Sequence, residues 1–407
     1  MNKKDLSILT LLFLIAFCVR FYDLSYPSFK WMDEAGHVPA ATNYWQHGQF
    51  EPDNWEHPPL RHIIFYGFLQ VFGDNPYGWR LRNVLFGAAA ALLTYLFARE
   101  ISGSRKAGLM AGLLMATDPL HIVLSRFTFE EVYGGAIFLA GLVLHLQHKR
   151  RSVVLMLSAF FMGCALATKW YYIPCWFLVY LLTLYEDGNY RKIKTALFIT
   201  STYVLIPVAV YLLSYYQWFG RGYSLNELGE FIANSYRVLQ SYQPQNYDYG
   251  LIFLSHISAG EWFFRPVIVG QGTLLPNNGG EFILYMNSLP VWILTFPAMT
   301  GIFILGAYRQ NLRMVIPVLF FCATYVLFLF VKRPTFIYSA VPLLPFAFTA
   351  IACGITHIAE RYSARIYYVA ITLMLAWNLY LFPLVTAKKI PMAPYRYIIE
   401  SPGVQSH

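Results

Sequence analysis

Eleven apolar stretches run through this sequence, most of them joined by short polar connections. Each is roughly 17 to 22 residues long, the length that an α-helix needs to cross the hydrocarbon core of a bilayer. Hydrophobic residues form 57% of the 407 residues and charged residues 13%, well under the roughly 25% charge of a soluble domain. The sequence therefore predicts an all-α polytopic membrane protein. The expected spans are 6–24, 81–99, 107–123, 129–147, 153–168, 170–185, 195–215, 286–307, 314–331, 336–356 and 366–385.

Two apolar segments need separate treatment. Residues 60–72 (LRHIIFYGFLQVF) are too short to cross comfortably, so we expect an interfacial or re-entrant helix there. The first stretch follows Lys3 and Lys4 as a signal peptide would, but no small-residue cleavage site follows it. We therefore expect it to be retained as the first helix.

Lys and Arg gather in alternate connections, and such clusters mark the cytoplasmic side of a membrane protein. With eleven spans all six clusters share one face, which predicts a cytoplasmic N-terminus. Residues 25–80 and 216–285 then form two sizeable extracytoplasmic loops, the second with an amphipathic helix at 225–239. Residues 1–385 would form one transmembrane domain, in the plasma membrane if the source is prokaryotic, and 386–407 a loosely ordered external tail. The clusters are Lys3 and Lys4; Arg99, Arg105 and Lys106; Lys149, Arg150 and Arg151; Arg191, Lys192 and Lys194; Arg309 and Arg313; Arg361 and Arg365.

The remaining composition excludes several classes of function. The net charge of +9 follows largely from the basic clusters, so no nucleic-acid partner is expected. The five cysteines lie in or beside apolar stretches without paired spacing, which is typical of small hydrophobes packed between helices. The sequence contains neither a P-loop nor a glycine-rich dinucleotide fingerprint.

Polar groups at the predicted outer surface are not explained by topology. Residues 31–60 carry five acids and three histidines between two apolar regions. Several cations also stand near outer helix ends, where burial is costly without a partner. They should either pair with acids, namely Asp33, Glu34, Glu130 and Glu131, or hold an anionic ligand such as a phosphate. These cations are Arg61, Arg80, Arg82, Arg126, Lys169, Arg221, Arg237, Arg265, Lys332 and Arg333.

A collinear set of motifs resembles the protein O-mannosyltransferases, members of the C-type (GT-C) superfamily of integral-membrane glycosyltransferases. The likeness runs from about residue 15 to 350, and it rests on the order of the motifs more than on any single one. The motifs are MDE at 32–34, HPPL at 57–60, WRLRNVLFG at 79–87, LSRFTFEE at 124–131, ATKW at 167–170, HISAGEWFFRP at 256–266, NSLPVW at 287–292 and FIYSAVPLLPF at 336–346.

The resemblance implies transfer of a sugar, mannose or a related hexose, from a polyprenyl-phosphate donor to an acceptor hydroxyl on the extracytoplasmic face. Asp33 stands where the family places its catalytic aspartate, the base that takes the hydroxyl proton as oxygen attacks the anomeric carbon. Inversion at that carbon is expected by analogy. Glu34 would point about 100° away on a helix and would orient the acceptor or pair with a basic residue.

The resemblance also assigns five residues to the donor phosphate: Arg333, Lys169, Arg126, Arg61 and His57. Arg333 precedes FIYSAVPLLPF, with a snorkelling helix-end charge as the alternative. His57 opens HPPL, which could equally be a plain helix-entry turn. The family usually continues with Gly-Lys, but here Arg61 and His62 follow, so Arg61 would supply the charge. Arg126 could instead form an ion pair with an acid across two helices.

Five further residues are assigned by resemblance to the acceptor side or the second loop: His256, Trp262, Arg265, Glu130 and Glu131. Either Glu130 or Glu131 could replace the family's usual Asp. The family's Gly-Asn-Pro is spread out here as Asn-Ser-Leu-Pro at 287–290, and its His-Tyr is replaced by Ser339 and Ala340. These departures leave the acceptor open.

No cofactor is expected. Asp33 and His37 are four residues apart, so a divalent metal stays an alternative, but a third well-spaced ligand is lacking. The acceptor could be Ser or Thr of a protein, or a lipid or cell-envelope glycan, as in the aminoarabinose transferases. A transporter or scaffold is the alternative outside enzymes, yet transporters place polar residues at mid-membrane, whereas this chain gathers them at one face.

Overall fold

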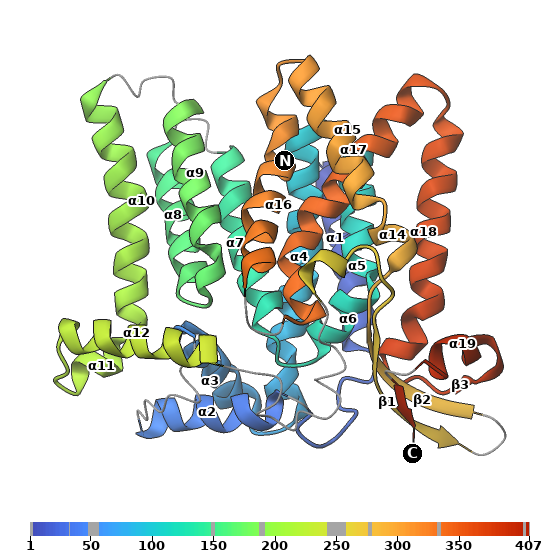
Figure 1. Ribbon diagram of the computed structural model, residues 1–407, viewed down its shortest axis with the longest axis horizontal. Helices are drawn as coiled ribbons and strands as arrows, with labels where there is room; N and C mark the ends of the chain where they lie inside the picture. Colours follow the sequence, from blue (N-terminus) through green and yellow to red (C-terminus); the bar gives the residue numbers. More distant parts are fainter. Residues whose placement is uncertain are drawn as a thin grey trace.

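The computed structural model describes residues 3–31, 33–47, 57–147, 151–186, 192–241, 258–275, 279–331, 335–401 and 404–406. A bundle of long helices forms its body, and short helices and a small sheet lie together at one end (Figure 1). The bundle helices are α1 (Lys3–Phe21), α4 (Pro76–Ser102), α5 (Arg105–Thr117), α6 (Pro119–Arg126), α7 (Glu130–Gln147), α8 (Ser152–Leu166), α9 (Ile173–Glu186), α10 (Ile193–Ser214), α14 (Leu289–Trp292), α15 (Thr295–Tyr308), α16 (Leu312–Phe330), α17 (Leu344–Arg361) and α18 (Ala364–Val385). The end helices are α2 (Glu34–His47), α3 (Leu60–Phe72), α11 (Tyr216–Gly220), α12 (Leu225–Ser241) and α19 (Arg396–Ile399), with 3-10 turns η2 (Trp170–Tyr172), η4 (Ala259–Glu261), η5 (Ile337–Leu343) and η6 (Ala393–Tyr395).

Each of the eleven predicted apolar stretches is helical over most of its length. Among the described residues, six helices are long and apolar enough to cross a membrane, or seven if the bent pair α5 and α6 is one span. Helices α8 and α9, at 15 and 14 residues, are shorter than a usual crossing. The chain is thus a mostly helical, multi-pass membrane protein.

The bend between α5 and α6 has a local cause. Asp118 alone lies between the two helices, which diverge by 54°, and Pro119 is the first residue of α6. Proline cannot donate a backbone hydrogen bond and is favoured at the first position of a new helix. The Asp118 side chain accepts from the His121 N–H and so caps α6.

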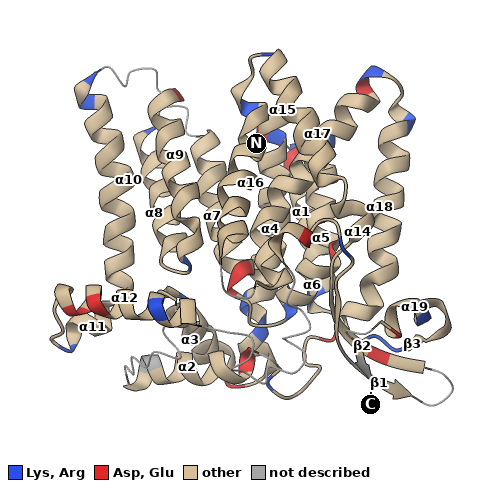
Figure 2. Ribbon diagram, viewed as in Figure 1, with Lys and Arg blue, Asp and Glu red and all other residues tan. Residues whose placement is uncertain are grey.

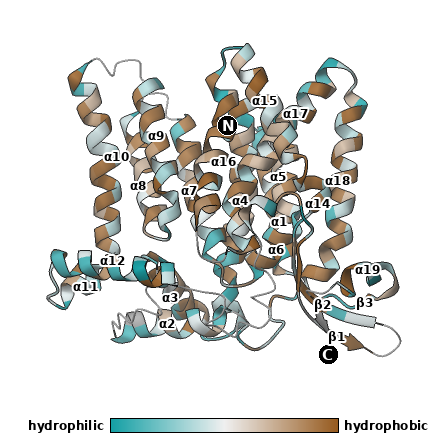
Figure 3. Cartoon of the chain, in the orientation of Figure 1, coloured by the Kyte–Doolittle hydropathy of each residue, from teal (hydrophilic) through white to brown (hydrophobic). Residues whose placement is uncertain are grey.

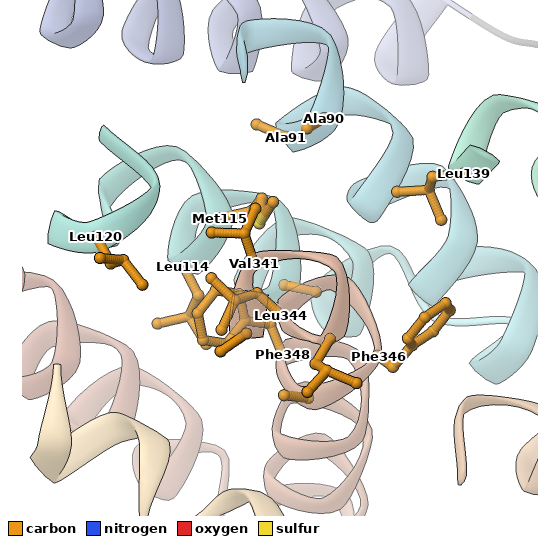
Figure 4. Packing of buried hydrophobic residues seen from close by; sticks show 14 of the residues in the cluster. Ala90, Ala91, Leu114, Met115, Leu120, Leu139, Val341, Leu344, Phe346 and Phe348 are labelled. Carbon is orange, nitrogen blue, oxygen red and sulfur yellow. The ribbon is translucent and has the colours of Figure 1, made fainter. Parts of the chain in front are cut away.

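The interior of the bundle is built around α17 and its neighbours α4, α5 and α16. Figure 4 shows Leu114 and Met115 of α5 beside Val341, Leu344 and Phe348. The apolar span that contains α17 is 78% buried, whereas that of α10 is 22% buried. Helices α10 and α18 accordingly carry apolar residues on their outer faces (Figure 3), as expected for surfaces that meet lipid.

The two ends of the bundle differ. Connections at the end near the N-terminus carry Lys and Arg, whereas α2, α3, α11, α12 and the sheet lie at the opposite end (Figures 1 and 2). The two segments predicted as large external loops therefore share one end of the molecule. The predicted amphipathic helix is present as α12, and the apolar 60–72 segment is the separate helix α3.

A four-stranded sheet corrects the all-α prediction. Strands β1 (Ile268–Leu275) and β2 (Gly279–Met286) pair antiparallel, flanked by β3 (Ile390–Pro391) and β4 (Val404–Ser406) in the order β3-β2-β1-β4. A Cβ on Gly272 would lie 2.1 Å from a Phe282 ring carbon, so the glycine lets that ring lie against the neighbouring strand. The sequence hid these strands because glycine breaks their apolar pattern and two of their partners lie about a hundred residues away.

The expectation of a loosely ordered tail is also wrong for the described part of it. The Ala387 N–H donates to the Phe282 carbonyl at 3.0 Å, which fixes the tail to β2. Tyr395 stacks on Tyr380 of α18 with ring centroids 4.7 Å apart. These contacts, with the pairing of β3 and β4, order residues that lack a long helical or strand pattern of their own.

Candidate functional site

Asp33 stands immediately before helix α2, at the end of the bundle away from the N-terminus. The Asp33 carbonyl accepts the His37 N–H at 2.8 Å, so the first turn of α2 places both side chains on one face. His37 Nε2 lies 3.9 Å from Asp33 Oδ2 and 3.6 Å from Glu130 Oε1 of α7. The His37 imidazole therefore lies between the carboxylate of Asp33, the predicted catalytic base, and that of Glu130.

Three more side chains complete a cluster that we call the acid–base cluster, made of Asp33, His37, Arg61, Glu130, Glu131 and Lys169. Arg61 of α3 forms an ion pair with Glu130. Lys169, between α8 and η2, forms an ion pair with Glu131 and lies 3.4 Å from Glu130 Oε2. The structure thus brings together residues from four separate segments, most of them buried.

The surroundings of Asp33 change its acidity. Desolvation, followed by the negative charges of Glu130 and Glu131, raises the pKa of Asp33 to about 7, against the opposing effect of Lys169 and Arg61. The side chain still keeps 32% of its surface accessible, so it is at the rim of the cluster. A carboxyl group with a pKa near neutrality is suited to general-base work, because it both accepts and releases a proton readily.

His37 is affected in the opposite sense. Desolvation lowers the pKa of His37 to about 4, although Glu130 opposes the shift. The imidazole is therefore neutral at physiological pH and offers one donor and one acceptor nitrogen.

Glu34 does not join this cluster. Its carboxylate accepts from Arg80 Nε and from a terminal nitrogen of the same guanidinium, each at 3.0 Å, and from the Trp31 N–H at 2.9 Å. Both side chains of the pair are fully buried. The geometry favours a structural role for Glu34, which holds the segment before α2 against α4, over contact with a substrate.

Arg126 lies elsewhere too. Its guanidinium donates to backbone carbonyls of Arg20, Tyr22 and Asp23, which ties α6 to the end of α1. Glu130 and Glu131 are paired with Arg61 and Lys169 instead. The predicted alternative of an ion pair between Arg126 and one of these acids is therefore wrong, since no such pair forms among the described residues.

The second-loop residues are not all brought to the cluster. Trp262 is fully buried and packs against the rings of Tyr325 and Phe328. Arg265 is exposed and pairs with Glu261 one turn earlier. His57 is half-buried and within electrostatic reach of Glu130. His256 and Arg333 lie outside the described residues.

Three residues in or near the cluster were missed as site residues, namely His37, Arg82 and Tyr285. His37 entered the sequence argument only as a possible metal ligand, and Arg82 only as one of ten cations. The i, i+4 spacing of Asp33 and His37 was the available signal for the first. Tyr285 of β2, buried and within electrostatic reach of Asp33, carried no signal, because its sheet was not anticipated.

A metal has little to hold it here. Within the described part of the chain, no group of three or more His, Cys, Asp or Glu is arranged to bind an ion. Arg61 and Lys169 already neutralise the carboxylates of Glu130 and Glu131. The arrangement instead combines the carboxyl group of Asp33, whose pKa is raised, with buried cations that can face an anionic group.

Comparison with known sequences agrees with the motifs. The model of the dolichyl-phosphate-mannose-protein mannosyltransferase family matches residues 67–221. A polyprenol-phosphate-mannose–protein mannosyltransferase of Corynebacterium glutamicum is 23% identical over 365 residues, which cover 73% of this chain and 70% of that protein. The chain spans between 40% and 70% of the length of the first three curated relatives it matches.

Comparison with solved structures supports the fold. The S. cerevisiae protein O-mannosyltransferase Pmt1–Pmt2 complex bound to the sugar donor matches with a TM-score of 0.77 at 12% identity, covering 100% of this chain and 93% of the other. ArnT from Cupriavidus metallidurans in the apo state matches with a TM-score of 0.61 at 16% identity, covering 96% and 67%. These likenesses confirm the resemblance to the protein O-mannosyltransferases and to the GT-C fold.

Proposed function

From the likeness of residues 67–221 to the dolichyl-phosphate-mannose-protein mannosyltransferases, we propose that this chain is a membrane glycosyltransferase. It moves mannose or a related hexose from a polyprenyl phosphate to a hydroxyl group, and Asp33 acts as the base. The observation that carries the proposal is the meeting of Asp33 with Arg61 and Lys169 in one cluster, from segments far apart in the chain.

The proposed reaction is a single displacement. The acceptor hydroxyl gives its proton to Asp33 while its oxygen forms a bond to the anomeric carbon. The bond from that carbon to the phosphate oxygen breaks, and the electron pair leaves with the lipid phosphate. Arg61 and Lys169 stabilise the negative charge that develops there, while Glu130 and Glu131 hold the two cations in place. Arg333 stays a proposed further cation for the phosphate, and His57 a proposed positioning residue.

The proposed topology has eleven spans and a cytoplasmic N-terminus. It puts α2, α3, α12 and the sheet outside, where the head group of a polyprenyl phosphate can reach Asp33 while its tail stays in the bilayer. The Lys and Arg at the other end of the bundle support this orientation (Figure 2). A cysteine-accessibility assay tests it: in intact cells a membrane-impermeant thiol reagent should label a cysteine at the exposed Tyr236 of α12 and not one at the exposed Tyr308, at the other end of the bundle.

The proposed acceptor is Ser or Thr of a protein, as the names of the curated mannosyltransferase relatives indicate. Transfer to a lipid or cell-envelope glycan is the second candidate, because the second loop departs from the family pattern and the fold also matches ArnT. The two differ in the product, which is either a modified protein or a modified glycolipid.

One assay tests the proposal. The purified protein in nanodiscs receives polyprenyl phosphate linked to radiolabelled mannose, glucose or pentose, together with Ser/Thr peptides and envelope lipids as acceptors. We expect transfer from the mannose donor and its loss in Asp33→Asn, with donor binding retained. Glu400→Gln, which removes an exposed carboxylate far from the cluster, is the control. If no donor supports transfer, the enzyme assignment fails, and near-normal turnover in Asp33→Asn ends the assignment of the base.

A further inference from the structure

Two arginines two residues apart on α4 meet very different surroundings. Arg80 donates to both carboxylate oxygens of Glu34 and to the carbonyls of Leu24 and Phe29. Among the residues that the structure describes, Arg82 makes one hydrogen bond, from Nε to the side-chain oxygen of Asn83 at 2.9 Å. Its terminal nitrogens, Nη1 and Nη2, are buried and have no acceptor in the described part of the chain. The whole residue is 1% exposed.

Two aromatic rings beside Arg82 offset only part of the free-energy cost of burying its unsatisfied N–H groups. The guanidinium carbon lies 4.1 Å from the centroid of the Phe65 ring and 4.6 Å from that of Tyr133. Such rings stabilise the positive charge through their faces. They do not accept the N–H groups, which lie in the guanidinium plane and require oxygen acceptors in that plane.

Arg82 interacts electrostatically with the acid–base cluster, although it is not one of its six residues. The charges of Glu130 and Arg61 act on it directly, and its own charge acts on His37 together with those of Arg61 and Lys169. The carboxylates that could serve it are already engaged, since Glu34 binds Arg80 and Glu130 binds Arg61. Arg82, beside the cluster, is thus a cation whose terminal N–H groups have no acceptor among the described residues.

We propose that Arg82 binds the phosphate of the lipid-linked donor through its two terminal nitrogens. The planar fork of a guanidinium matches two oxygens of a phosphate. This inference rests on the proposed function and adds a residue that the motifs did not assign. Arg61 and Lys169 are already paired with Glu130 and Glu131, so they act on the phosphate mainly through their charge. Arg82 instead donates hydrogen bonds to it from terminal nitrogens that have no acceptor among the described residues.

Measuring the binding of the donor lipid without its sugar tests the proposed contact between Arg82 and the phosphate separately from catalysis. Affinities of the protein in nanodiscs are measured for undecaprenyl phosphate, for undecaprenol and for inorganic phosphate. The wild type should bind undecaprenyl phosphate more tightly than undecaprenol. Arg82→Met keeps an unbranched side chain between Phe65 and Tyr133 and should weaken undecaprenyl phosphate binding roughly tenfold or more, without changing undecaprenol binding. Loss of inorganic phosphate binding alone, with undecaprenyl phosphate binding intact, overturns the assignment to the lipid phosphate.

Arg396→Gln is the matched control, because Arg396 is exposed and pairs only with Glu400 among the described residues. The melting temperature without ligand separates binding from folding. A purely structural Arg82 predicts a lower melting temperature with unchanged affinity in the variant, and that result overturns the proposal. If Arg82→Met does not fold, Arg82→Lys replaces it. An ammonium group cannot form the two-point contact, so undecaprenyl phosphate should bind about three- to tenfold more weakly, and wild-type affinity overturns the proposal.

The outcome also separates this inference from the proposed function. If the wild type transfers sugar while Arg82→Met binds undecaprenyl phosphate normally, the role of Arg82 fails and the enzyme assignment stands. If the wild type neither binds undecaprenyl phosphate nor transfers sugar, the proposed function itself fails.

Discussion

Asp33 and Glu34 are adjacent in the sequence, yet their carboxylates lie in two different clusters. Asp33 faces His37 and the acids of α7, whereas Glu34 is enclosed with Arg80. Consecutive side chains at a helix start diverge by about 100°, and each finds its partners on a different face. One carboxylate is therefore partly accessible and the other is fully buried.

Removal of the Glu34 charge should destabilise the protein. Glu34→Gln leaves Arg80 buried without its counter-charge, and breaking one partner of such a pair costs about 3–5 kcal/mol. We expect a clear fall in the melting temperature in detergent, with partial recovery in the double variant Glu34→Gln/Arg80→Met. Asp33→Asn should not lower the melting temperature, because its raised pKa means that ionisation of Asp33 opposes folding at higher pH. An equal fall in both single variants would contradict the division of roles.

Turnover should rise with pH around neutrality. The base must be ionised to accept a proton, and the pKa of Asp33 is raised to about 7. Activity should therefore increase about tenfold per pH unit well below 7 and level off above it. Titration of His37 should not change the rate between pH 5 and 7, since its pKa is lowered to about 4. A pH profile of kcat/KM, which reports the pKa of the free enzyme, measures this, and a profile that is flat from pH 5 to 8 argues against Asp33 as the base.

Variants at Lys169 and Glu131 should separate an effect on stability from an effect on sugar transfer. Lys169→Met removes a cation proposed to stabilise the leaving phosphate, so transfer should fall about a hundredfold, and it leaves Glu131 buried without its partner. The double variant Lys169→Met/Glu131→Gln should recover melting temperature but not transfer. Recovery of transfer in the double variant would show that the pair is only structural.

Substitution in β1 should test whether the sheet matters to the fold. A Cβ on Gly270 would lie 2.2 Å from the Ile283 carbonyl oxygen, whereas a Cβ on Gly301 of α15 meets nothing within 4 Å. Gly270→Ala should cost about 1–3 kcal/mol, and Gly301→Ala should cost nothing or add slight stability. Thermal unfolding of the two variants measures the contrast. Equal melting temperatures would mean that the pairing of β1 and β2 does not contribute to the stability of the fold.

The helical part of the fold could be read from the sequence because it depends on local quantities. The length of each apolar stretch and the basic residues between them are properties of neighbouring residues, and each stretch is helical in the structure. The sheet could not be read, since β4 pairs with β1 across more than a hundred residues and glycine hides the alternation. The same limit applied to Arg126, whose partners are carbonyl groups at the end of α1.

The sequence alone determined that the chain enters a membrane through many helices and that acids and bases gather in the segments between them, because hydropathy and charge are carried by each residue. Tertiary structure alone decided which charge meets which. Asp33, Arg61, Glu130 and Lys169 become neighbours only when α2, α3, α7 and the segment between α8 and η2 come together. Within the described residues, the terminal nitrogens of Arg82 are left without an acceptor because Glu34 and Glu130 are paired with Arg80 and Arg61. Partner choice among buried charges depends on distances that packing sets, and no local pattern encodes them.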